Sequence, residues 1–359
     1  MWTRTQDGSV IDGNGRVIFF GEQRFVEDIC LGDCCFICGA TPGDVPFNNE
    51  HVLPEWLLRR YNLFDRTIEL PNGNTIRYDR YTVPCCVACN DLMGENIERP
   101  MSEITRQGAK ATIDFLSANG NLHFFVWMGL IFLKTHLKDR THRVHLDARK
   151  GDHIIADGYD WTLLHNLHSI IRSFCVGVEI DTQALGSFLC LELRQTPGFD
   201  RFDFGDLYAA QTMMLRLDDL GLITVLNDAC GVQSFYLDRL KRMDGSLSEV
   251  QFREVMVELA FLNLHLKNRP DFKVTLDLVN ERQLITVTLP KLELADLEMP
   301  LRGALFLQAF KNGLPHMAVG RSPEEVEELS KAGKLTFLFD DQGNFIKDGI
   351  RSLKTPPTE

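Results

Sequence analysis

Two short stretches decide the fold of the N-terminal part: CCFIC (residues 34–38) and CCVACN (residues 85–90). Two cysteines three positions apart can turn their thiolates onto one tetrahedral ion. In each stretch only the second and the last cysteine have this spacing. The pattern predicts a structural zinc site, because four thiolates leave no open coordination position, and a redox dithiol is the alternative. The four predicted zinc ligands are Cys35, Cys38, Cys86 and Cys89.

Oxygen and nitrogen donors lie close to these cysteines in the sequence. The segment between the two pairs contains NEHVLP (residues 49–54), and Asn90 directly follows Cys89. A hard divalent cation such as magnesium prefers oxygen ligands, which Glu50 and Asn90 can supply. His51 offers an imidazole base that titrates near neutral pH. Carboxylate, amide and imidazole on one zinc-held scaffold suit metal-assisted hydrolysis of a phosphodiester.

The order CxxC, [D/E]HxxP and CxxCN resembles the HNH endonucleases of the ββα-metal (His-Me finger) superfamily, over about residues 35–98. The resemblance implies that His51 is the general base that deprotonates the attacking water. It implies that Glu50 and Asn90 hold a catalytic magnesium or manganese ion, and that the four cysteines hold zinc. The implied substrate is nucleic acid, and we expect DNA.

Three positions depart from the pattern of that family. Glu50 replaces an aspartate that many members have, Leu53 stands where some members carry a further histidine, and Met93 replaces a frequent lysine. These departures bear on rate and metal preference more than on the type of reaction. Two alternatives stay open: a non-catalytic zinc module that binds nucleic acid or a partner protein, and a nuclease subunit that is silent until a partner such as an ATPase binds.

Length and composition describe a globular chain of about two domains. The chain has 359 residues, of which 44% are hydrophobic and 25% are charged, which excludes a disordered or collagen-like protein. The net charge of −12 means that binding to nucleic acid would need a local basic patch or a basic partner. No apolar stretch approaches the ~20 residues that a bilayer requires. We expect no membrane segment and no secretory signal, and therefore a cytoplasmic protein.

Turn signals and hydrophobic periodicity predict an α+β chain. We expect a zinc-stapled ββα-metal nuclease domain over 1–118, and a larger α+β domain of uncertain strand order over 119–359. The second domain is expected to regulate, sense or dock a partner, and antiviral defence is suggested only by resemblance of architecture. A homodimer would allow cleavage of both strands.

The expected hairpins pair 9–12 with 16–20 and 67–70 with 75–78. The expected helices are 90–117, 122–137, 160–176, 229–242, 247–267 and one that starts at Ser322; the expected later strands are 187–193, 207–216, 221–227, 272–279 and 283–289.

Weaker signals concern contacts with nucleic acid. The candidates are Arg59, Arg60 and Arg143, and the segment 134–153 carries six basic residues that form either a phosphate-facing patch or a solvated loop. His165 and His168 lack a third ligand for a second metal site, so an amphipathic core helix is the favoured interpretation. Glu98, about two helical turns beyond Asn90, either approaches the metal or makes an ordinary salt bridge.

Overall fold

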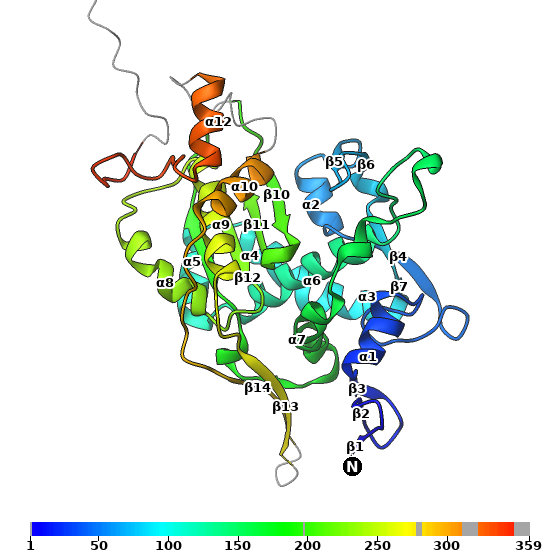
Figure 1. The fold of residues 1–359 in the computed structure, drawn as a ribbon. Coiled ribbons are helices and arrows are strands. Elements are labelled where there is room, and N and C mark those ends of the chain that lie inside the picture. The colour runs from blue at the N-terminus through cyan, green and yellow to red at the C-terminus, as the bar shows by residue number, and fades with distance from the viewer. Residues whose placement is uncertain (1, 197, 278–281, 311–321, 348–359) are drawn as a thin grey trace, which may run out of the picture. The chain divides into compact units, whose positions relative to one another are not determined.

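A computed structural model of the chain describes residues 2–196, 198–277, 282–310 and 322–347. It combines helices with several small sheets, which confirms the α+β class (Figure 1). The chain folds into two units, each built from three separate stretches. The first unit contains Met1–Glu103, Leu122–Ala184 and Phe272–Thr286, and the second contains Ile104–Asn121, Leu185–Asp271 and Val287–Glu359. The units therefore divide the chain differently from the ranges 1–118 and 119–359.

Short antiparallel strands build the N-terminal part of the first unit. The hairpins predicted from the Asp12–Gly15 and Pro71–Asn74 turns are both confirmed, since β2 pairs with β3 and β5 with β6. A third antiparallel pair, β4 with β7, joins segments that are distant in the sequence. The strands are β1 (Thr3–Arg4), β2 (Val10–Ile11), β3 (Val17–Phe19), β4 (Phe47–His51), β5 (Thr67–Glu69), β6 (Thr75–Arg77) and β7 (Thr82–Cys86).

The helical segment after β7 is interrupted twice, unlike the continuous helix predicted over 90–117. A π-helical turn, η3 (Gly94–Glu98), separates α3 (Val87–Met93) from α4 (Arg99–Thr105). The next helix, α5 (Gly108–Asn119), begins at a glycine with φ +85°. This left-handed conformation cannot continue a right-handed helix, so α4 must end before it. Two shorter helices precede β7, namely α1 (Glu22–Arg24) and α2 (Glu55–Arg60).

Two further helices of the first unit, α6 (Leu122–Asp139) and α7 (His165–Val176), follow α5. α6 is buried on nearly every side, as its apolar sequence predicts. The core-helix interpretation of α7 is confirmed, because Leu167 and Ile171 on this helix are buried. Trp161 and Leu164, in the short 3₁₀ helix Trp161–Leu164 just before it, are buried as well. No single helix among the described residues is long and apolar enough to cross a membrane, although α5 and α6 taken together would meet that length and composition.

The second unit contains an antiparallel sheet with the strand order β10-β11-β12-β9. The prediction of a single strand over 207–216 was wrong. The chain reverses at Gln211, whose φ of +42° is left-handed, so that β10 ends before this residue and β11 begins after it. The strands are β9 (Phe188–Glu192), β10 (Phe202–Leu207), β11 (Thr212–Leu217) and β12 (Leu220–Val225). The helices beside them are α8 (Gly231–Lys241), α9 (Glu249–Leu264), α10 (Met299–Phe310) and α12 (Pro323–Lys331).

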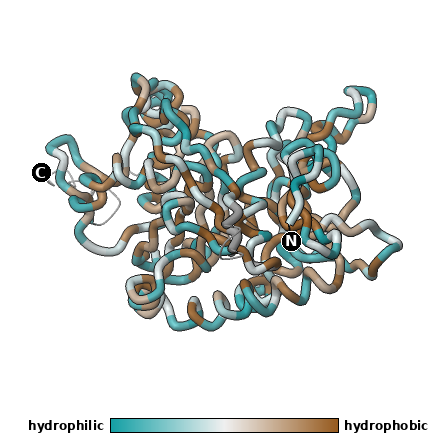
Figure 2. The backbone as a smooth tube through the Cα atoms, turned by 90° about the horizontal axis from the view of Figure 1, so that it is seen from below, coloured by the Kyte–Doolittle hydropathy of each residue, from teal (hydrophilic) through white to brown (hydrophobic). Residues whose placement is uncertain are grey.

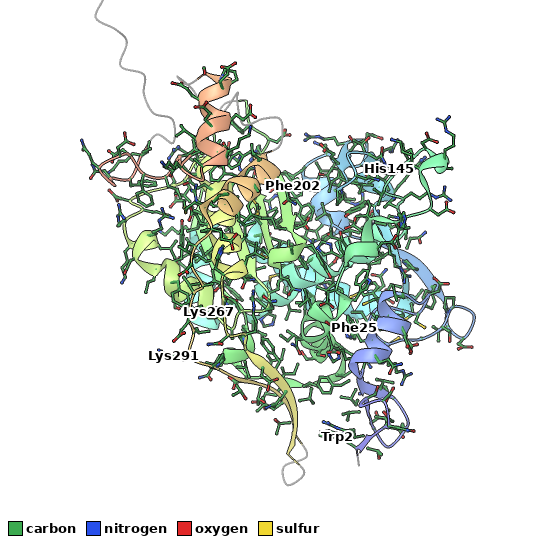
Figure 3. The ribbon with its side chains drawn as sticks, in the orientation of Figure 1. Trp2, Phe25, His145, Phe202, Lys267 and Lys291 are labelled. Carbon is green, nitrogen blue, oxygen red and sulfur yellow. The ribbon has the colours of Figure 1, made fainter. Side chains whose placement is uncertain are left out.

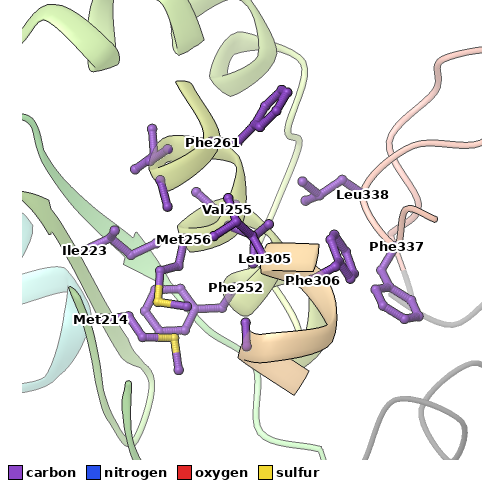
Figure 4. Packing of buried hydrophobic residues seen from close by; sticks show 14 of the residues in the cluster. Met214, Ile223, Phe252, Val255, Met256, Phe261, Leu305, Phe306, Phe337 and Leu338 are labelled. Carbon is purple, nitrogen blue, oxygen red and sulfur yellow. The ribbon is translucent and has the colours of Figure 1, made fainter. Parts of the chain in front are cut away.

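The hydrophobic core of the second unit lies between α9 and this sheet (Figures 1 and 4). Met214 and Ile223 of the sheet meet Val255 and Met256 of α9, and Phe306 of α10 closes the other side (Figure 4). Hydrophilic residues gather mainly on the outer turns and loops (Figure 2). The helix predicted to start at Ser322 is confirmed as α12, and Ser322 and Glu325 form a capping box at its first turn.

A small sheet completes the first unit with strands from two distant parts of the chain. Its order is β13-β14-β8, and β14 runs parallel to β8. Its strands are β8 (Glu179–Ile180), β13 (Asp271–Asp277) and β14 (Arg282–Thr288). The sequence also predicts that the strands 272–279 and 283–289 form a hairpin across Asn280 and Glu281, and that turn lies outside the described residues.

Candidate metal centre and active site

Four thiols converge where the loop after the π-helical turn η1 (Phe25–Cys30) meets the start of α3. Their sulfur atoms all lie within 4.8 Å of one another, and the Sγ atoms of Cys38 and Cys86 are 3.7 Å apart. Around one ion with metal–sulfur bonds of about 2.3 Å, a tetrahedral shell has sulfur–sulfur edges of about 3.8 Å. The cluster could therefore hold one metal ion. Its members are the four cysteines that the spacing singles out: Cys35, Cys38, Cys86 and Cys89.

A fifth thiol, Cys85, lies beside this cluster. Its Sγ is 3.6 Å from that of Cys35, and its side chain is buried. Hydrogen bonds from Cys38, Cys85 and Cys89 lower the pKa of Cys35. Hydrogen bonding to Cys35 and Cys38, together with burial, raises the pKa of Cys89. Metal binding would displace the protons of the ligand thiols.

Helix α7 fixes the first cysteine pair by contacts with its backbone. Arg172 is buried and donates hydrogen bonds to the carbonyl oxygens of Val17, Ile18 and Ile37. The Nε2 atom of His168 lies 2.9 Å from the carbonyl oxygen of Phe36. Burial and the nearby Arg172 lower the pKa of His168 to about 3, so the ring is neutral and donates this hydrogen bond. The sequence pattern identified neither contact.

The Nε2 atom of His165 is also engaged by backbone, at 2.7 Å from the carbonyl oxygen of Phe20. Together with the contact of His168, this agrees with the core-helix interpretation of α7. The two histidines serve to dock the helix on the N-terminal strands and the cysteine loop.

The paired strands β4 and β7 and the helix α3 form a ββα unit that carries the three predicted catalytic residues. Glu50 stands opposite Val83, and His51, the last residue of β4, stands opposite Thr82. Asn90 lies in the first turn of α3, and its Nδ2 atom donates a hydrogen bond of 3.0 Å to Oδ1 of Asn48. This bond ties α3 to β4.

The three side chains have different environments. Glu50 is buried, whereas His51 is half-buried and its ring lies edge-to-face with Phe64. Consecutive side chains of a strand leave from opposite faces, so Glu50 shares a face with Asn48 and His51 takes the other. Among the described residues, no hydrogen bond joins His51 to Glu50 or to Asn90.

The donor set fits a hard divalent cation in its chemistry. The amide nitrogen of Asn90 donates its hydrogen bond to Asn48. The amide oxygen of Asn90 is therefore the atom that can accept a hydrogen bond or bind a metal ion. Glu50 adds a carboxylate two residues along the strand from Asn48. A carboxylate and an amide oxygen are both oxygen donors of the kind that a hard divalent cation prefers.

Glu50 has a partner that the sequence did not predict. The Nζ atom of Lys134 lies 2.6 Å from Oε1 of Glu50 and 3.3 Å from Oε1 of Glu98. Lys134 belongs to the basic segment 134–153, but its side chain is fully buried in α6. The prediction that Lys134 contributes to a surface patch was therefore wrong. Glu98 thus makes a salt bridge with Lys134, which is one of the two roles that the sequence left open for it. Burial raises the pKa of Glu98 to about 7, with Lys134 opposing this shift.

The predicted nucleic-acid contacts lie at the surface of the first unit. Arg59 and Arg60 end α2, and Arg59 pairs with Glu55. In the loop between α6 and α7, Arg143 pairs with Asp152 at 2.9 Å. The exposed His145 lies near the outer part of this loop (Figure 3). Local acidic partners thus offset part of the positive charge, and contact with nucleic acid stays a prediction.

Comparison with known proteins gives no match: no protein family, no curated protein and no solved structure resembles the chain significantly. Function must therefore be inferred from the chemistry of the residues themselves.

Proposed function

We propose that the protein is a metal-dependent endonuclease of the HNH type, which hydrolyses phosphodiester bonds of nucleic acid, with DNA as the expected substrate. The observation that carries the proposal is the ββα unit of β4, β7 and α3, joined at the four-thiol cluster. Within this unit, β4 carries the carboxylate of Glu50 and the imidazole of His51, and α3 carries the amide of Asn90. We assign zinc to the cluster because four thiolates in a tetrahedral arrangement are typical of structural zinc.

Each of the three residues has a role that suits its environment. His51 is half-buried at the end of β4, where its imidazole is accessible to take a proton from water. Glu50 and Asn90 would hold a magnesium or manganese ion through their oxygen atoms. When bound, such an ion supplies positive charge to the phosphate and to the departing 3′ oxygen. The cytoplasmic location, the defence role, a protein partner for the C-terminal part (residues 119–359) and a homodimer belong to the same proposal.

Nicking of supercoiled plasmid in magnesium or manganese tests the proposal. We expect His51→Ala to lower the nicking rate by at least about 100-fold, because a general base contributes 10²–10⁴-fold. The control His123→Ala changes a histidine in α6 of the same unit and should keep the wild-type rate. Equal rates for wild type and His51→Ala would exclude the catalytic role of His51.

The ion pair of Glu50 with Lys134 favours one alternative, a non-catalytic zinc module in which Glu50 is structural. Such a module would bind nucleic acid or a partner protein without any divalent cation besides zinc. Gel-shift binding that survives both magnesium depletion and His51→Ala, with no nicking, would support it. Nicking that appears only after copurification with a second protein would instead indicate a subunit activated by a partner.

A further inference from the structure

Three charged side chains meet in the interior of the first unit. Lys134 comes from α6, Glu50 from β4 and Glu98 from the end of the π-helical turn η3. Their side chains are 0%, 10% and 15% exposed, respectively. Three elements from separate parts of the sequence thus place two carboxylates around one ammonium group.

Stability alone is a poor explanation for this cluster. Removing charges from water is costly, and replacing a buried ion pair by well-packed apolar residues is often neutral or stabilising. Single π-helical turns are frequent at functional sites. The π turn here is the one that ends at Glu98. The cluster therefore points to a role for its charges, and Glu50 is the member with a proposed function.

We infer that Lys134 is a positioning residue that orients Glu50 for a divalent cation. This inference rests on the proposed nuclease function. The ammonium group holds Oε1 of Glu50 at 2.6 Å, which fixes the carboxylate. The other oxygen of Glu50 would then bind the ion. Glu98 accepts a second, longer hydrogen bond of 3.3 Å and keeps the ammonium group in place.

The same geometry separates the roles of the two glutamates. Carboxylates that bind metals are usually held by a further hydrogen bond, and losing that partner weakens metal affinity by about 10- to 100-fold. Glu50 shares a strand face with Asn48, which holds Asn90. Glu98 has no such link to Asn90 among the described residues. We therefore assign the cation to Glu50 and Asn90, and we assign the positioning of Glu50 to Lys134 and Glu98.

Binding of Mn²⁺ to the zinc-loaded full chain, followed by electron paramagnetic resonance of free Mn²⁺, tests this inference. Two variants are compared, Glu98→Gln and the double variant Glu98→Gln/Lys134→Met, which differ only at Lys134. The double variant avoids leaving two unpaired carboxylates in the interior. We expect the double variant to bind Mn²⁺ about 10- to 100-fold more weakly than Glu98→Gln, whose amide oxygen can still accept the hydrogen bond from Lys134.

Two further variants complete the comparison. Glu98→Gln/Lys134→Arg keeps the positive charge and should restore most of the affinity. Lys110→Met makes the same chemical change as Lys134→Met at an exposed position of α5 and should bind like wild type. If the double variant loses its zinc or its secondary structure, Lys134→Gln decides: weaker Mn²⁺ binding supports the inference, and unchanged binding overturns it.

Equal Mn²⁺ affinity in Glu98→Gln and the folded double variant would overturn the inference. So would loss of binding in Glu98→Gln alone, because Glu98 would then be a ligand. Either result leaves the nuclease proposal intact if His51→Ala still abolishes nicking and Glu50→Gln weakens Mn²⁺ binding. Absence of Mn²⁺ binding by wild type would overturn the inference, whereas nicking that is unaffected by His51→Ala would contradict the proposed function.

Discussion

Cys85 and Cys86 are neighbours in β7, but only Cys86 belongs to the four-thiol cluster. We therefore predict that Cys86→Ser loses bound zinc, whereas Cys85→Ser keeps one zinc ion per chain. Structural zinc contributes about 10 kcal/mol or more to the folding of small zinc domains, so Cys86→Ser should also destabilise the first unit strongly. The amount of zinc released per chain on denaturation, measured for each variant and for wild type, tests this prediction. Equal zinc loss in both variants would assign Cys85 to the cluster.

Local spacing made the cysteine site predictable, whereas the supporting residues could not be found in this way. The CxxC pairs and the Glu50-His51 dipeptide are contiguous patterns whose chemistry depends on neighbouring positions. Lys134 lies 84 residues from Glu50, and Arg172 lies 135 residues from Ile37. A lysine or arginine in an otherwise apolar helix is an ambiguous signal, because its partner is known only once the helix has packed.

Close packing of α10 against the end of α12 gives a prediction at the scale of elements. A Cβ atom at Gly303 would lie 1.8 Å from the carbonyl oxygen of Ser330, so Gly303→Ala must push the helices apart. We expect a loss of several kcal/mol, beyond the 1–3 kcal/mol typical of overpacking. At Gly94, also helical, a Cβ would meet no atom within 4 Å. Gly94→Ala should be neutral or slightly stabilising. Urea unfolding compares the two variants, and equal losses would contradict this packing.

The buried carboxyl of Glu254 in α9 predicts a pH dependence of stability. Burial and the neighbouring Glu258 raise its pKa to about 7 against the opposing effect of Arg302. The folded protein then holds a proton that the unfolded chain releases between pH 4.5 and 7. This contribution is present at low pH and is lost as the pH rises, by up to about 1.4 kcal/mol per pH unit.

Urea unfolding of wild type and Glu254→Gln at pH 5, 6, 7 and 8 measures this contribution. Glutamine does not ionise, and its amide oxygen can still accept the backbone hydrogen bonds from Phe337 and Leu338, which both go to one oxygen of Glu254. The free energy of unfolding of wild type should fall relative to that of the variant as the pH rises to 7. Parallel pH profiles would show that Glu254 keeps an ordinary pKa.

Elements with local turn signals were predictable, and those set by distant contacts were not. The hairpins β2–β3 and β5–β6 follow Gly and Asn turns that specify the reversal by themselves. The pairing of β4 with β7 spans a long connection, so no local pattern reveals its register. The reversal at Gln211 was missed because a glutamine with left-handed φ carries no sequence signal of its own.

The division of the whole molecule into units gives a prediction about fragments. A fragment that ends at residue 118 lacks α6 and α7, and with them Lys134, His168 and Arg172. It would leave Glu50 without its ammonium partner and the cysteine loop without its hydrogen-bond donors. We expect fragment 1–118 to be largely unfolded, as judged by poor dispersion in its ¹H–¹⁵N spectrum with zinc present. A dispersed spectrum would show that the nuclease module folds without those helices.

The pairing of β8 with β14 has a consequence during synthesis on the ribosome. Strand β8 emerges early, but its partner follows only after the large middle stretch of the other unit. At about 5–20 residues per second, the nascent chain would expose this unpaired edge for several seconds. The first unit can therefore close only after this stretch of the second unit has been made.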